Sequence, residues 1–153
     1  MSMDSSLFDE VADALRSMAP PELGPIHVRA RTYGLKAWFG SESPPREHYE
    51  AQVISPDAVR GAKVLALEVG FHTEHPRQAD NDAVIAKLQS GEKKWRRVVG
   101  HEAEVGPFLG KADVWRRVSE TWPDPDLDDE ELPLELATRL TDYVTALEPY
   151  LRR

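Results

Sequence analysis

The stretch from Arg46 to Glu74 constrains the fold more than any other part of the sequence. Residues 46–54 alternate between polar and apolar side chains, and so do residues 62–74. Alternation with a period of two is typical of strands that bury one face. The connection at residues 55–61 is short and contains proline, aspartate and glycine, which favour turns. The sequence therefore predicts an antiparallel pair of strands.

The same kind of pattern predicts the remaining elements. We expect an amphipathic helix over residues 4–18, a strand over 26–39, a helix over 79–99 and a helix over 133–151. Gly34 indicates a bulge or turn in the strand, and Gly91 a kink or a split in the helix. Residues 102–109 and 112–121 are predicted as two short strands, although a helix fits 112–121 almost as well.

The element order α-β-β-β-α-β-β-α predicts an α+β fold, with a single antiparallel sheet of about five strands and helices packed on one face. This order is similar to that of type III secretion chaperones, which are small acidic adaptors; the resemblance concerns element order and no residue motif. A chain of 153 residues is expected to form one domain, 1–153, in which an acidic loop over residues 122–132 leads into the C-terminal helix.

Composition narrows the class of protein. The absence of cysteine excludes disulfides and thiolate metal sites. The N-terminal residues lack the pattern of a signal peptide, and no apolar stretch approaches the about 20 residues of a membrane helix. We therefore expect a cytoplasmic protein with no membrane partner. Arginine outnumbers lysine 13 to 6, which is typical of a GC-rich genome and favours a bacterial source.

Ionisable side chains gather on the polar side of the predicted strand pair. Alternate positions within a strand share a face, and residues opposite each other across a pair have Cβ atoms about 4.5–5.5 Å apart. The candidate binding residues on this face are His48, Glu50, Gln52, Glu68, His72 and Glu74. We expect a face that is mainly solvated, because antiparallel sheets commonly expose one side. The alternatives are a binding surface and a metal or acid–base site.

A second candidate is basic and aromatic. Lysines and arginines surround Trp95 and follow Trp115, and the possible basic patch comprises Lys93, Lys94, Arg96, Arg97, Arg116 and Arg117. Such residues can neutralise phosphates while an exposed indole stacks on a base. The net charge of −8 argues against general affinity for nucleic acid, so we do not expect a nucleic-acid partner.

No strong catalytic motif accompanies these residues: the sequence has no nucleophile elbow, no phosphate-binding loop and no dinucleotide fingerprint. We therefore predict a non-enzymatic binding or adaptor protein, a homodimer whose partner is another protein. We expect no cofactor and assign no metal ligand. The alternative is a hydrolase in which His72 acts as a metal ligand or general base, supported by Glu50, Glu68 and His48.

Overall fold

The computed structural model describes residues 6–41, 45–110 and 112–152. Six strands form one antiparallel sheet in the order β1-β2-β3-β4-β6-β5. The strands are β1 (Ile26–Arg31), β2 (Gly34–Phe39), β3 (Glu47–Ile54), β4 (Ala66–Thr73), β5 (Glu104–Pro107) and β6 (Arg116–Pro123). The helices are α1 (Ser6–Met18), α2 (Gln78–Gln89), α3 (Glu92–Val99) and α4 (Leu132–Leu151), with two short 3-10 turns at Pro21–Leu23 and Pro56–Ala58. The predicted α+β class and its single sheet are confirmed.

The predicted strand pair lies at the centre of the sheet as β3 and β4. Their antiparallel register places His48 opposite His72 and Gln52 opposite Glu68. On the other side of the same strands, Tyr49 meets Phe71 edge-on, with ring centroids 5.5 Å apart. The alternation in the sequence therefore sorts ionisable and apolar side chains onto opposite faces of the sheet.

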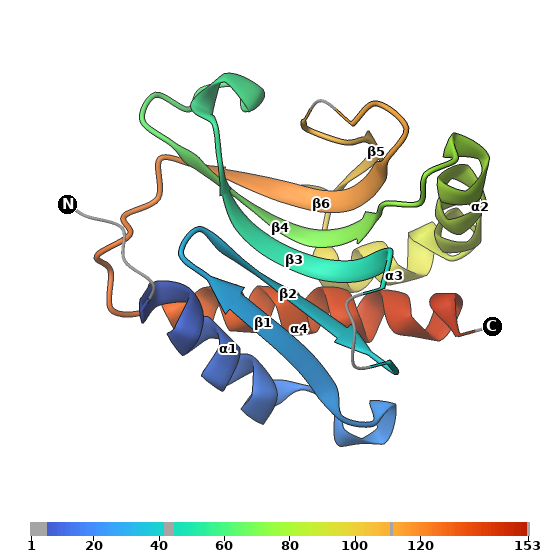
Figure 1. Cartoon of the computed structure of the whole chain (residues 1–153), viewed down its shortest axis with the longest axis horizontal. Helices are drawn as coiled ribbons and strands as arrows, with labels where there is room; N and C mark the ends of the chain where they lie inside the picture. The colour runs from blue at the N-terminus through green and yellow to red at the C-terminus, as the bar shows by residue number, and fades with distance from the viewer. Residues whose placement is uncertain (1–5, 42–44, 111, 153) are drawn as a thin grey trace.

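Helices cover the apolar face. Figure 1 shows α1 and α4 lying side by side against the sheet. Their buried stripes, which include Phe8, Leu15, Leu140 and Leu147, join the apolar side chains of β2, β3 and β4 in one core. Full burial of a leucine or phenylalanine side chain contributes roughly 1.5–3 kcal/mol, so this face supplies most of the driving force for folding. Within the described segments, no helix combines the length and the apolar character needed to cross a bilayer.

Two predicted elements divide at a glycine. Residues 26–39 form the hairpin β1–β2, which turns before Gly34, so the sheet has six strands rather than about five. Residues 79–99 form two helices that separate at Gly91. A side chain at Gly91 would collide with the ring of Tyr150, 2.1 Å from a Cβ built there. The close approach of α4 thus explains why the chain needs glycine at this junction.

The last strand lies further along the chain than predicted. Strand β6 begins at Arg116 and continues to Pro123, so it includes the first two residues of the predicted acidic loop. Asp124 then adopts a left-handed conformation, with φ of 46°. Its carboxylate accepts hydrogen bonds from the backbone N–H groups of Lys63, Val64 and Leu65. The donor–acceptor distances range from 2.7 Å for Val64 to 3.3 Å for Leu65. These bonds anchor the start of the acidic loop to the segment before β4 and hold the pKa of Asp124 below its usual value.

Candidate metal centre

The polar face of β3 and β4 is buried, which contradicts the expectation of a solvated surface. His72 and Glu68 are 0% and 1% exposed, and His48 is 2% exposed. Phe108 and Trp115, in the segment between β5 and β6, cover this face: the ring of Phe108 lies 4.7 Å from that of His72, and Trp115 packs against Phe108 at 5.2 Å. Residues far away in the sequence thus exclude water from the predicted site.

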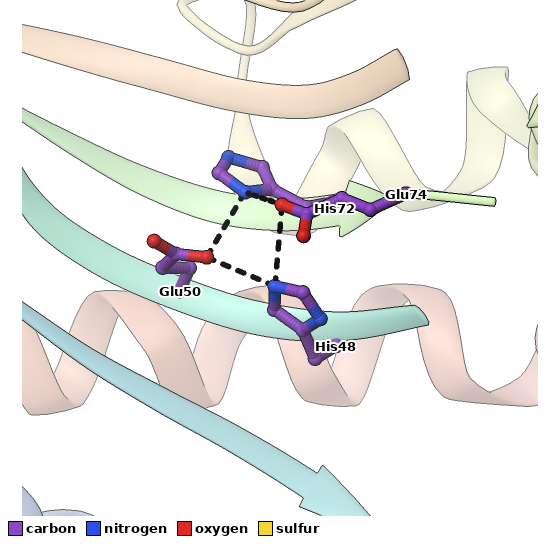
Figure 2. A group of neighbouring side chains, drawn as sticks. All are labelled: His48, Glu50, His72 and Glu74. Atoms are coloured by element: carbon purple, nitrogen blue, oxygen red, sulfur yellow. Dashed lines mark hydrogen bonds and ion pairs between the residues drawn. The ribbon is translucent and has the colours of Figure 1, made fainter. Parts of the chain in front are cut away.

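Four of the predicted residues converge on one point (Figure 2). The His/Glu tetrad comprises His48, Glu50, His72 and Glu74, whose ligand atoms all lie within 4.8 Å of one another. The Nε2 atom of His48 is 2.9 Å from Oε1 of Glu50 and 3.5 Å from Oε2 of Glu74. The Nδ1 atom of His72 is 3.2 Å from each of the same two oxygens. Nitrogen and oxygen therefore alternate around a small ring.

The outer nitrogen of each imidazole has a partner that fixes its proton. His48 Nδ1 lies 3.1 Å from the carbonyl oxygen of Pro45. A carbonyl oxygen can only accept, so Nδ1 of His48 donates. His72 Nε2 lies 2.8 Å from Oε2 of Glu68, to which it donates. When either imidazole is neutral, its inner nitrogen consequently presents a lone pair to Glu50 and Glu74.

This arrangement requires positive charge at its centre. Lone pairs on two nitrogens and two carboxylates would repel one another, so the inner atoms need either protons on both imidazoles or a cation between them. Burial by itself would lower the pKa of His72, but hydrogen bonds to Glu50, Glu68 and Glu74 raise that pKa well above its usual value. The pKa of His48 is also raised, because bonds to Glu50 and Glu74 outweigh its burial.

The carboxylates respond in the opposite sense. Burial would raise the pKa of Glu50, yet hydrogen bonds from His48 and His72 lower it to about 2. The same two histidines hold the pKa of Glu74 below its usual value against the effect of burial. The side chains of Glu50 and Glu74 remain 11% and 13% exposed, whereas those of both histidines are at most 1% exposed. Among the described side chains of the His/Glu tetrad, the two carboxylates are therefore the ones that solvent reaches.

The other two predicted residues support the His/Glu tetrad from outside. Glu68 accepts a hydrogen bond from Gln52 at 2.9 Å and another from the hydroxyl of Ser119 at 2.7 Å. Burial would raise the pKa of Glu68, but its bond to His72 and those from Ser119 and Gln52 lower it. All six candidate binding residues thus belong to one connected network, and Glu68 fixes the orientation of His72.

Sequence reasoning missed Asn81, which orders the chain around Glu74. The buried Asn81 amide accepts hydrogen bonds from Thr73 and the backbone N–H of His75 and donates to the carbonyl oxygens of His75 and Val114. It therefore joins β4, α2 and the covering segment at one point. A signal existed in the sequence: Asn81 shares the helical spacing of Val84, Ile85 and Leu88, so it is a polar residue at a core position.

The structure does not gather the possible basic patch into one site. Arg96 donates to Glu92 and to the carbonyl oxygen of Ala103. Arg116 donates to Asp82 on α2, and the buried Arg117 donates to Glu104 on β5 and to Ser119. The remaining members, Lys93, Lys94 and Arg97, are exposed on α3. The buried Trp95 donates its indole N–H to Leu88, so it belongs to the core rather than to a stacking surface.

Comparison of the chain with family models, with curated proteins and with solved structures gave no match.

Proposed function

We propose that the His/Glu tetrad binds one divalent transition-metal ion. The observation that carries the proposal is that the inner nitrogens of His48 and His72 and one oxygen each from Glu50 and Glu74 face a common centre, while both outer nitrogens are held by acceptors. Two imidazoles with two carboxylates form a ligand set that suits zinc, iron(II) or manganese(II).

The spacing supports coordination. Zinc binds nitrogen and oxygen ligands at about 2.0–2.2 Å, which places neighbouring ligands of a tetrahedron about 3.3–3.6 Å apart. The four nitrogen–oxygen edges of the His/Glu tetrad measure 2.9, 3.5, 3.2 and 3.2 Å. Four of the six ligand–ligand separations are therefore close to tetrahedral values, and all six lie within 4.8 Å.

The hydrogen-bond partners of the two outer imidazole nitrogens also support metal binding. A histidine that ligates a metal commonly donates its other N–H to a carboxylate or a backbone carbonyl, which fixes its tautomer. His72 has the first kind of partner in Glu68, and His48 has the second kind in Pro45.

The competing interpretation is a proton-filled cluster, in which both imidazoles are charged and neutralise Glu50 and Glu74. Titration of metal-free protein with Zn²⁺ and with Co²⁺, followed by calorimetry and by the visible absorption of bound Co²⁺, separates the two. We expect one equivalent to bind saturably. If the folded protein binds neither ion saturably, the metal proposal is wrong and the proton-filled cluster stands.

Matched variants locate the ion. Glu74→Gln preserves the side-chain shape but removes a charged ligand, and His48→Gln removes an imidazole. Each should weaken binding by at least about tenfold. His101→Ala is the control, since His101 is exposed and lies outside the site. Equal affinities in Glu74→Gln, His48→Gln and the control, all folded by circular dichroism, would place the ion elsewhere and contradict the proposal.

A hydrolase that uses this metal is the second candidate function, because Glu50 also lines an open cavity from which a substrate could approach the ion. The adaptor and homodimer interpretation stays a prediction. Light scattering coupled to gel filtration measures the oligomeric state directly.

A further inference from the structure

A cavity of about 510 Å³ lies beside the His/Glu tetrad, between the β1–β2 hairpin and β3. Its lining includes Arg29, Arg31 and Lys36 from the hairpin and Glu50 from β3. The register explains this grouping: Arg29 pairs with Lys36, and Lys36 pairs with Glu50, so these three side chains project from the same face in one row. The cavity thus opens on the face that carries the candidate metal centre.

Gly34 lines the cavity where β2 closely approaches β3. It stands between Arg31 on β1 and Gln52 on β3 in the next row of the sheet. A Cβ atom at Gly34 would lie 3.0 Å from both the carbonyl oxygen of Ala51 and Cβ of Gln52. Both separations are shorter than ordinary van der Waals contacts, so the close approach of β3 leaves little room for a side chain at this position.

The cavity is electropositive in a protein of net charge −8. Arg29, Arg31 and Lys36 line it, and across residues 6–41, 45–110 and 112–152 none of the three has a carboxylate within ion-pair distance. The one carboxylate in the lining, Glu50, already accepts hydrogen bonds from two imidazoles. Three cations without carboxylate partners surround one carboxylate that two imidazoles already neutralise. This balance of charge favours an anionic ligand.

The rim adds an exposed aromatic ring. Tyr33, at the turn of the hairpin, is 62% exposed and lines the cavity, whereas the side chains of Leu35 and Val53 pack in the core on the opposite face. An exposed aromatic ring beside a guanidinium group suits a ligand that has a planar body as well as a charge.

We infer that this cavity binds a small organic anion, in which a carboxylate or phosphate group is attached to an apolar or aromatic body. Arg31 and Lys36 contact the anionic group, and Tyr33 packs on the body. The inference does not depend on the metal, because the cations and the ring are present without it.

The test uses metal-free protein in the presence of a chelator, so that its outcome is independent of the metal titration. Four probes are compared at constant ionic strength by two-dimensional amide NMR: phenyl phosphate, benzoate, inorganic phosphate and phenol. We expect phenyl phosphate or benzoate to bind saturably and to shift the amide signals of residues 29–36 and 50–53. Inorganic phosphate and phenol, which each lack one feature, should bind more weakly.

Charge-matched variants provide the control. Arg31→Gln and Lys36→Gln should each weaken the binding of the better probe by about tenfold, the usual effect of losing one charge-assisted hydrogen bond. Tyr33→Ala should weaken phenyl phosphate but leave inorganic phosphate unchanged. Lys93→Gln and Lys94→Gln remove the same charge from exposed positions on α3 and should have no effect.

Three results would overturn the inference: no saturable binding of either organic anion, signal shifts confined to residues outside the cavity, or equal weakening by Lys94→Gln and Lys36→Gln. The first two show that the cavity is not a ligand site, and the third shows only general attraction of anions to the surface. A chain that fails here but binds Zn²⁺ keeps its metal site and loses its anion site.

Discussion

Two buried polar clusters lie on opposite faces of the sheet, and they satisfy their charges differently. On the helix-covered face, Glu120 accepts hydrogen bonds from Arg139 at 2.8 Å, from the hydroxyl of Tyr143 at 2.7 Å and from the indole N–H of Trp122 at 2.8 Å. On the other face, the His/Glu tetrad joins two imidazoles to two carboxylates. Both clusters are buried and ionic.

The difference lies in the donors. Arginine and tryptophan always carry their protons. Burial and the neighbouring Glu120 keep the pKa of Tyr143 above its usual value, so that hydroxyl also remains a donor. The Glu120 cluster is therefore complete by itself. The two imidazoles can gain or lose the inner proton, so the His/Glu tetrad can accept another cation in its place. The Glu120 cluster, whose donors keep their protons, can stabilise the fold. The His/Glu tetrad, whose inner protons can be replaced, can also bind a cation.

The largest expected effect on stability comes from removing the central carboxylate of the Glu120 cluster. Glu120→Ala leaves the buried hydroxyl of Tyr143 and the partly buried donors of Arg139 and Trp122 without their acceptor, so we expect a loss of about 3–5 kcal/mol in the free energy of unfolding. Urea denaturation measures it. Glu120→Gln, which keeps one acceptor oxygen, should lose less. Equal stability of Glu120→Ala and the wild type would show that the Glu120 cluster does not stabilise the fold.

The second effect separates the two clusters. Zn²⁺ at a free concentration of 100 times its dissociation constant should stabilise the folded wild type by about 2.7 kcal/mol, because only the folded chain holds the ligands together. Thermal unfolding with Zn²⁺ and with chelator measures this gain. Because its binding is expected to be at least about tenfold weaker, Glu74→Gln should lose at least about half of the gain at the same Zn²⁺ concentration, while Glu120→Gln, although less stable, should keep it. An undiminished zinc-induced gain in Glu74→Gln would contradict the comparison.

A smaller effect is expected at the outer partner of His72. Glu68→Gln retains shape but no longer accepts fully from His72, Gln52 and Ser119, so the imidazole is less firmly oriented. We expect the affinity for Co²⁺ to fall about 10–100-fold while the stoichiometry stays at one. Competition against a chelator of known affinity gives the ratio. If Glu68→Gln instead bound less than one Co²⁺ per chain, Glu68 would be a metal ligand rather than an outer partner of His72.

The smallest effect concerns Asp124, whose carboxylate is bonded to backbone but exposed. Its pKa is lower in the folded chain than in the unfolded chain, so its stabilising effect is complete above the unfolded pKa of about 3.9 and disappears as the pH falls through the folded value. Asp124→Asn should therefore be less stable than the wild type at neutral pH and equally stable at strongly acidic pH. Urea denaturation at both pH values tests this, with Asp128→Asn as the control.

The sequence could predict the sheet centre and the grouping of ionisable residues, because both follow from local alternation in β3 and β4. It could not predict their burial. That depends on Phe108 and Trp115, which lie in a segment that the local pattern assigned to strands and which packs on β4 only through long-range contacts. Asn81 was missed for a related reason: its partners lie at the end of β4 and at Val114, so helical spacing alone gave it no role.

The position of Phe108 also has a kinetic consequence. Its ring closes the imidazole side of the His/Glu tetrad, and the partly exposed Glu50 and Glu74 form the remaining entrance. An ion that enters there meets carboxylates first and histidines last, and it leaves in the reverse order. Capture by an external chelator should therefore begin at the acidic entrance, and enlarging the opening with Phe108→Ala should accelerate ion exchange more than it changes the affinity.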